Sequence, residues 1–185
     1  MPTLSDILVP DRACGACTIC CKHLLLDTPE VKKAYGELCP HCVKGSGCQI
    51  YETRPTSCRS WYCGWRVMAQ LDDSWRPDIS KILVAITAED IPVSYRSPGM
   101  RIDLLGSVQK VLWPPLVNLI GGAIQNRVGV FLSVPGRQGQ ASGKIFLNGA
   151  LAAAHASRDL ARVQGALLKA AEACVNLPKE KIEFR

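Results

Sequence analysis

The chain has 185 residues, which is enough for one ordinary domain or for a small module followed by a compact second one. Nine of its ten cysteines lie between residues 14 and 63, so the enrichment is local. Residues 1–12 lack a sustained apolar segment, and the longest apolar run, residues 111–124, is too short to span a bilayer. These features argue against a secretory signal and a transmembrane helix, and we expect a cytoplasmic protein with no membrane association.

The net charge of +6 arises outside the cysteine region. Residues 1–75 contain eight basic and eight acidic side chains, whereas residues 76–185 contain fourteen basic and eight acidic ones. The excess could compensate a negatively charged metal–thiolate centre. An excess this small and scattered is, however, more typical of a solvated surface.

Residues 12–65 consist mainly of cysteine, glycine, proline and short polar links, with too few regularly spaced apolar residues for a self-sufficient core. Such a segment needs cross-links to fold. We expect a helix that begins near Cys17 and runs into residues 24–26. Thr28-Pro29-Glu30 predicts a second short helix through Tyr35, which Gly36 would end.

The later part of the chain alternates between strand and helix patterns. We expect strands over residues 81–87, 99–108, 128–134 and 144–147, and a helix over residues 108–127 with a Pro-Pro break near its start. Asn148 is expected to cap a final helix over residues 149–174. That helix would face a core with Leu160, Val163, Leu167, Ala171 and Cys174.

These elements predict an α+β fold. Residues 1–75 would form an irregular cysteine-rich metal-binding module, and residues 76–185 a small sheet-and-helix layer with about four strands under two helices. We expect the two parts to pack as one compact unit. Cys174, alone on an apolar helix face, is expected to be a small buried hydrophobe and not a ligand.

The first cysteine motif is Cys14-Gly15-Ala16-Cys17-Thr18-Ile19-Cys20-Cys21. A two-residue gap lets a tight turn present two sulfurs to one metal, and Gly15 suits that turn. If Cys17 begins a helix, Cys20 and Cys21 share its face, so that three thiols can converge.

Five further cysteines follow at less regular spacing: Cys39, Cys42, Cys48, Cys58 and Cys63. Zinc takes four ligands, and so does a four-iron cluster, so nine thiols fit two closed sites or one site with spare thiols. Disulfides are disfavoured by the absence of a targeting signal and by the adjacency of Cys20 and Cys21. Thioredoxin-type redox chemistry would need a βαβ context that the pattern lacks.

The first motif, together with Gly47-Cys48-Gln49-Ile50-Tyr51-Glu52-Thr53-Arg54-Pro55-Thr56-Ser57-Cys58-Arg59 and Cys63, resembles the CxxCxxCC family of YkgJ-like cysteine-cluster proteins, described as zinc- or iron-chelating. The resemblance covers residues 14–63. It implies eight metal-binding cysteines: Cys14, Cys17, Cys20, Cys21, Cys39, Cys48, Cys58 and Cys63. Cys42 lies where the family commonly has an apolar residue, so it would be a spare thiol or a substitute ligand.

The same resemblance bears on the cofactor. The family is similar to the cysteine domain of flagellin lysine N-methylase, in which the motif is associated with an iron–sulfur cluster. This association favours an iron–sulfur cluster over zinc.

Two arginines flank Cys58 and are candidates for offsetting the negative charge of a thiolate-bound centre. Arg54 is favoured because Pro55 fixes the turn beside it, whereas Arg59 could equally be solvated. His41, between Cys39 and Cys42, could replace a thiol, while His23 and His155 are expected to be structural or on the surface.

Four large aromatic residues, Trp61, Tyr62, Trp65 and Trp75, follow the last cysteines and are expected to form the core of the module and shield the centre from water. A nucleic-acid stacking platform is disfavoured because basic residues do not alternate with these aromatics. Nucleic acid is therefore not an expected partner, whereas a protein partner is left open.

No phosphate-binding glycine motif and no nucleophile–base pair can be assigned. The sequence therefore predicts a metal-binding protein that holds an iron–sulfur cluster or zinc through clustered thiolates. The alternative is a redox or protein-modifying, methylase-like enzyme in which the cluster supports an active site. The chain is too short for a complete methylase with its own S-adenosylmethionine domain.

Overall fold

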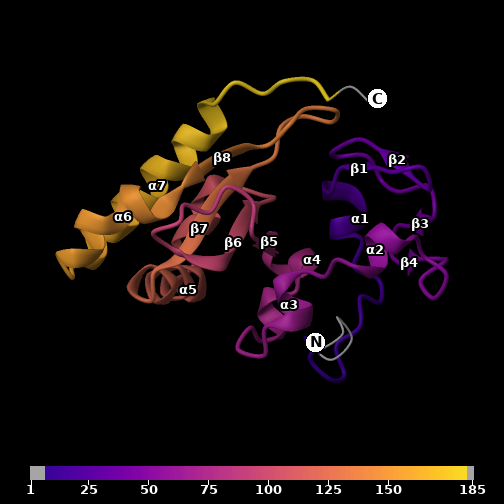
Figure 1. The fold of residues 1–185 in the computed structure, drawn as a ribbon, viewed down its shortest axis with the longest axis horizontal. Helices are drawn as coiled ribbons and strands as arrows, with labels where there is room; N and C mark the ends of the chain where they lie inside the picture. The colour runs from indigo at the N-terminus through magenta and orange to yellow at the C-terminus, as the bar shows by residue number, and fades with distance from the viewer. Residues whose placement is uncertain (1–6, 183–185) are drawn as a thin grey trace. The chain divides into compact units, whose positions relative to one another are not determined.

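The computed structural model describes residues 7–182 and has the predicted α+β fold (Figure 1). The chain divides into two compact units. The first contains residues 1–83 and two later segments, Gly136–Ala141 and Glu180–Arg185, and the second contains Val84–Pro135 and Ser142–Lys179. The first unit therefore extends past the expected boundary at residue 75. It also includes two segments from later in the sequence.

The cysteine-rich region is irregular, as predicted. Its helices are short: α1 (Ile19–His23), α2 (Thr56–Arg59), α3 (Gly64–Val67) and α4 (Pro77–Ser80), with a 3₁₀ turn at Asp73–Trp75. Two miniature hairpins lie among them, β1 (Leu26–Asp27) with β2 (Lys32–Lys33) and β3 (Cys42–Val43) with β4 (Gly47–Cys48). Turns, more than regular elements, shape this unit.

The expected helix after Thr28 is wrong, because the β1–β2 hairpin occupies that segment. The amide of Val31 donates to Thr28 Oγ1 (3.1 Å), and the amide of Thr28 donates to the carbonyl of Val31 (3.1 Å). These two bonds close a tight turn instead of opening a helix. The preceding helix also ends earlier than expected, at His23, since Leu24 adopts an extended backbone.

The second unit is built on a four-stranded sheet in the order β5 (Ile82–Thr87), β6 (Arg96–Leu104), β7 (Val128–Val134) and β8 (Gly143–Phe146). The strands predicted over residues 81–87, 128–134 and 144–147 are confirmed to within one residue, whereas the one expected over residues 99–108 runs from Arg96 to Leu104. β6 and β7 are parallel, and the connection between them contains the 3₁₀ turn Val108–Leu112 and α5 (Pro114–Gln125), which separate at the expected Pro-Pro break. A parallel pair requires such a crossover.

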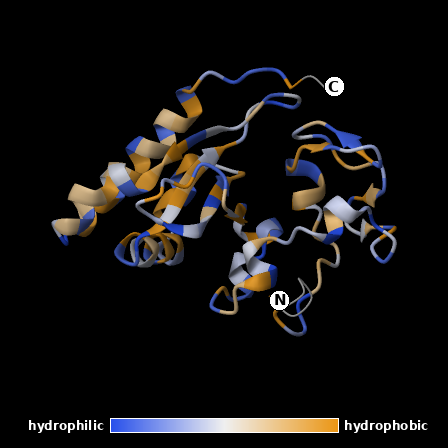
Figure 2. Ribbon diagram, viewed as in Figure 1, coloured by the Kyte–Doolittle hydropathy of each residue, from blue (hydrophilic) through white to orange (hydrophobic). Residues whose placement is uncertain are grey.

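The helices α5, α6 (Leu147–Ala156) and α7 (Leu160–Asn176) all contact β7, whose central residues are buried. Figure 2 shows that hydrophobic residues concentrate in the strands of this sheet. Among the described residues, no helix is long and apolar enough to cross a membrane.

The expected single final helix is wrong: it is two helices, α6 and α7. Asn148 lies inside α6, where its side chain accepts from the amide of Val130 and donates to the carbonyl of Val128, at 2.8 Å each. The cap of α7 is Asp159, whose Oδ1 accepts from the amides at the start of that helix.

The predicted apolar stripe of the final helix is correct at its C-terminal end only. Leu167, Ala171 and Cys174 are fully buried, whereas Leu160 is 61% exposed because it begins the helix beyond the edge of the core. The thiol of Cys174 donates to the carbonyl of Leu132 (3.3 Å), so this cysteine belongs to the core of the second unit.

Candidate metal centre

One pocket in the first unit is lined by all eight of the cysteines that the resemblance singles out. Its cavity measures about 90 Å³, and its wall also includes His41 and Arg54. Cys42 does not line it. The thiols come from three separate stretches of chain: Cys14, Cys17, Cys20 and Cys21; Cys39 and Cys48; Cys58 and Cys63.

The first stretch has the turn that its spacing predicts. The amide of Cys17 donates to the carbonyl of Cys14 (2.9 Å), and Gly15 between them has a φ of +50°. Helix α1 then carries Cys20 and Cys21. The turn and the helix together present four thiols from eight residues.

The second stretch docks on the first through its backbone. The amide of Cys39 donates to the carbonyl of Cys21 (3.0 Å). Gly47 has a φ of +81°, and a Cβ at this position would lie 2.0 Å from the carbonyl oxygen of Gly15. Only glycine allows this approach, so Gly47 places Cys48 beside the first motif.

The third stretch is held by Arg54. Its guanidinium donates to the carbonyls of Tyr51 and Cys58 and to the hydroxyl of Tyr62 (2.9 Å), and it stacks 4.0 Å from the centre of the Tyr51 ring. Arg54 therefore lies at the pocket, in the position that the sequence suggested. Arg59 is exposed and does not line the pocket.

Burial governs the protonation of the thiols. It raises the pKa of Cys14, Cys58 and Cys63 and takes that of Cys17 to about 11. Without a metal these groups are therefore neutral, and a metal that binds them must displace their protons.

Cys21 differs from the other thiols. The Cys20 thiol donates a hydrogen bond to it, and this bond, helped less by Cys42 and Lys33, lowers the pKa of Cys21 against the opposing effect of burial. Among the thiols whose pKa is shifted, Cys21 is the one whose pKa is lowered, so it releases its proton to a cation most readily.

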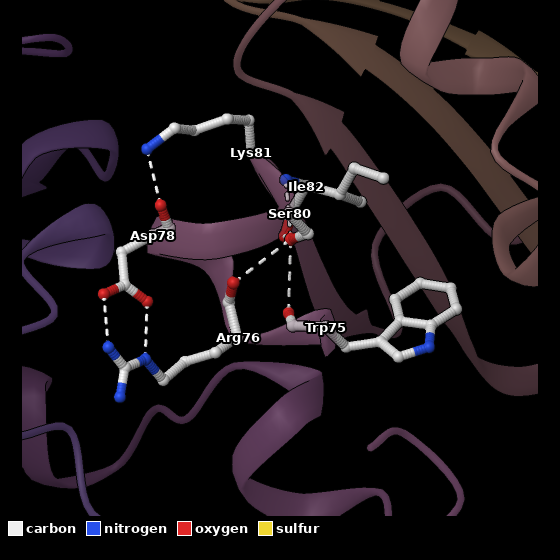
Figure 3. A network of polar contacts seen from close by, with 6 residues as sticks. All are labelled: Trp75, Arg76, Asp78, Ser80, Lys81 and Ile82. Carbon is white, nitrogen blue, oxygen red and sulfur yellow. Dashed lines mark hydrogen bonds and ion pairs between the residues drawn. The ribbon is translucent and has the colours of Figure 1, made fainter. Parts of the chain in front are cut away.

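The aromatic residues lie where the sequence placed them. Trp61 and Tyr62 line the pocket, and Trp65 and Trp75 are buried. The segment after Trp75 is held by the polar contacts shown in Figure 3. In it, the guanidinium of Arg76 donates two hydrogen bonds of 2.7 Å to the carboxylate of Asp78.

That segment also touches the cysteines. Asp78 is hydrogen-bonded to Cys17. The hydroxyl of Ser80 accepts from the amide of Ile82 (3.1 Å) and contacts the carbonyls of Trp75 and Arg76, which fixes the turn into β5 (Figure 3).

The histidines play different parts. His41 is exposed but lines the pocket, whereas burial, followed by the charges of Lys22 and Lys33, lowers the pKa of His23 to about 4. His23 is consequently a neutral ring, 6.5 Å from the ring of Tyr35.

Two buried cations, one lining the pocket and one near its thiols, were not anticipated from the sequence. The side chain of Lys33 is fully buried, and its ammonium donates to the carbonyls of Lys22, Ala34 and Glu37 at 2.9–3.0 Å. Arg66 is 6% exposed and lines the pocket, and its Nε and Nη1 have no hydrogen-bond partner. A pair of buried donors without acceptors fits a site that takes up an anionic centre.

Within residues 7–182, no group of three or more His, Cys, Asp or Glu side chains already stands at the distances of a bound metal ion. The thiols therefore share a pocket without being closed on one point, and binding would require their side chains to turn inward. The donor set nevertheless fits zinc or an iron–sulfur cluster, because both prefer thiolates.

Comparison with known proteins adds no relative: no family model, no curated protein and no solved structure matches this chain.

Proposed function

We propose that this chain is a metal-binding protein that holds an iron–sulfur cluster or zinc through eight cysteines: Cys14, Cys17, Cys20, Cys21, Cys39, Cys48, Cys58 and Cys63. One observation carries the proposal. Eight thiols from three stretches of chain, chosen by a sequence pattern alone, line a single pocket, and Cys42, which departs from that pattern, does not.

The surroundings of the thiols support metal over disulfide chemistry. All ten cysteines are free thiols, and the pocket contains buried positive charge from Arg66 and a clamp from Arg54. Four thiolates around a divalent centre carry net negative charge, which such groups offset. A disulfide is neutral and would gain nothing from them.

The resemblance to the CxxCxxCC family makes an iron–sulfur cluster the favoured occupant. A cluster would supply one-electron redox capacity or a structural cross-link, and zinc a cross-link only. In either case the protein's own residues supply thiolates, shield them with Trp61 and Tyr62, and balance their charge. A reducing cytoplasmic location belongs to the same proposal, since it would keep the thiols free.

The test is metal analysis of the full chain purified without oxygen, together with its absorption spectrum. We expect bound iron with broad visible absorption, or colourless protein with bound zinc. The Cys174→Ser variant is the matched control, because Cys174 lies in the core of the second unit and should leave metal content unchanged. A folded, metal-free protein whose cysteines are paired in disulfides would overturn the proposal.

A further inference from the structure

We infer that the eight cysteines form two separate four-thiol centres, each with its own buried cation. Site A consists of Cys14, Cys17, Cys20 and Cys63, with Arg66. Site B consists of Cys21, Cys39, Cys48 and Cys58, with Lys33. This inference rests on the proposed function and specifies which thiols share a metal.

The cavity next to the main pocket defines site A. It measures about 20 Å³, and the only cysteines in its wall are the four of site A. The rest of its wall is apolar apart from Arg66: Trp65, Pro77 and Leu83. These four thiols therefore surround a space that the other cysteines do not reach.

Helix geometry explains how adjacent cysteines can serve different centres. Successive residues of an α-helix point about 100° apart around its axis. Cys20 and Cys21 are successive residues of α1, and only Cys20 reaches the smaller cavity. The hydrogen bond from Cys20 to Cys21 shows that the two sites adjoin at this helix.

Backbone contacts define site B. The amide of Cys39 donates to the carbonyl of Cys21, and the β3–β4 hairpin brings Cys48 back to the same side of the pocket. Cys58 lines the main pocket but not the smaller cavity, which groups it with Cys21, Cys39 and Cys48.

The two buried cations act mainly on different groups of thiols. The charge of Arg66 acts on Cys14 and on Cys63, and Arg66, whose Nε and Nη1 have no hydrogen-bond partner, lines both cavities. The ammonium of Lys33 acts mainly on Cys39 and Cys21 of site B and less on Cys20 of site A. Each four-thiolate centre would thus have one fixed positive charge that water cannot screen.

Cys42 is not a ligand in this assignment. It stands opposite Cys48 in the hairpin and is hydrogen-bonded to Cys21, but it does not line either cavity. A Cys42→Ala variant should keep both metals.

The experiment measures metal per chain in the full protein and in paired cysteine variants. We expect the wild type to hold two zinc ions or two four-iron clusters. Cys17→Ser and Cys48→Ser should each remove half of the metal. The double variant Cys17→Ser/Cys63→Ser should still hold half, whereas Cys17→Ser/Cys48→Ser should hold none.

The outcomes separate the two proposals. A wild type without metal contradicts the proposed function itself. A wild type with one centre, or loss of all metal in Cys17→Ser/Cys63→Ser, overturns the two-site assignment while leaving metal binding intact. Loss of metal in Cys42→Ala overturns the membership of site B.

A second measurement does not depend on removing a ligand. Arg66→Met should weaken metal binding at one centre about 10- to 100-fold, the range found when partners of metal ligands are removed, and leave the other centre unchanged. Arg66→Lys should restore part of the loss. Competition with a chelator, followed as two separate phases, would show this, and equal weakening of both centres would contradict the inference.

Discussion

At the scale of single residues, the cysteine region depends on one contact between two glycines. Gly47 lies against the carbonyl of Gly15, and any side chain at residue 47 would collide with it. The contact joins the first cysteine motif to the hairpin that carries Cys48. The positions of the thiols on the two segments are therefore linked through backbone atoms and not through side chains that could rearrange.

Replacing Gly47 with alanine should separate these segments. We expect Gly47→Ala to lose most of the bound metal and to expose thiols to an alkylating reagent. The control is Gly45→Ala, because Gly45 has a similar φ of +83° but open space around it. Both variants incur the left-handed strain of about 1–2 kcal/mol, so only the collision distinguishes them. Equal metal content in the two variants would contradict this reading.

Asp103 allows a pH prediction in the second unit. It is fully buried and paired with Arg101 (3.0 Å), and burial, the larger effect, raises its pKa. A folded state that holds a proton more tightly than the unfolded state loses stability as pH rises through the folded pKa. The free energy of unfolding of the wild type minus that of Asp103→Asn should therefore decrease as the pH rises.

The measurement is urea unfolding of both proteins at about pH 4.5 and about pH 7.5, compared as a difference so that other titrations cancel. A difference that stays constant, or grows toward alkaline pH, would show that the Arg101 charge outweighs burial at Asp103.

The candidate site divides into residues that the sequence could reveal and residues that it could not. The cysteines and Arg54 were found because their chemistry is intrinsic and their spacing is local. Lys33 and Arg66 were missed because burial of a cation depends on which distant segments cover it. Lys33 follows an exposed lysine in the sequence, and nothing in that pair distinguishes the buried one.

At the scale of elements, the junction between β7 and α6 shows how a polar side chain can mimic a cap. Asn148 looks like the cap of a helix in the sequence, but it satisfies the backbone of β7 from inside α6. Its amide replaces a neighbouring strand at Val128 and Val130. The residue that caps is Asp159, at the start of α7.

These two residues should therefore differ when each is changed to alanine. Asn148→Ala leaves the buried amide of Val130 unpaired, which costs about 1–3 kcal/mol, in addition to the lost bond to Val128. Asp159→Ala removes an exposed cap and should cost about 1 kcal/mol. Thermal or urea unfolding would rank them, and a larger cost for Asp159→Ala would refute this assignment.

Most of the long elements were predictable and the short ones were not, for a physical reason. β5 and β7 are continuous apolar runs with consecutive buried residues, and α5 has apolar residues spaced to form one buried helix face. The two-residue strands of the cysteine region have no such period. They exist where turns such as Thr28–Val31 and the glycines of the β3–β4 hairpin bend the chain.

At the scale of the whole molecule, the two units differ in what holds them together. The second unit has a continuous apolar core of fully buried residues from the sheet and helices, including Ile102, Leu132 and Leu167. The first has short elements joined by turns, with its cysteines gathered at a pocket. Metal would therefore stabilise the first unit directly and the second only indirectly.

Removing metal with a chelator should affect the units unequally. We expect amides of residues 14–63 to lose most of their protection against hydrogen exchange, while amides of β6 and β7 keep theirs. Exchange followed by mass spectrometry, before and after chelation, would show this. Equal loss in both regions would mean that the units unfold together, and no change in either would mean that metal does not support the first unit.

The later segments of the first unit have a consequence for how the protein is made. The amide of Gly139 donates to the carbonyl of Tyr35, and the amide of Ile182 donates to that of Gly139. A ribosome releases the cysteines long before it releases residues 139 and 182, so the unit that begins first is finished last. During synthesis the thiols are therefore exposed before residues 139 and 182 can pack on the unit. In this interval they can most easily be oxidised or bind another metal.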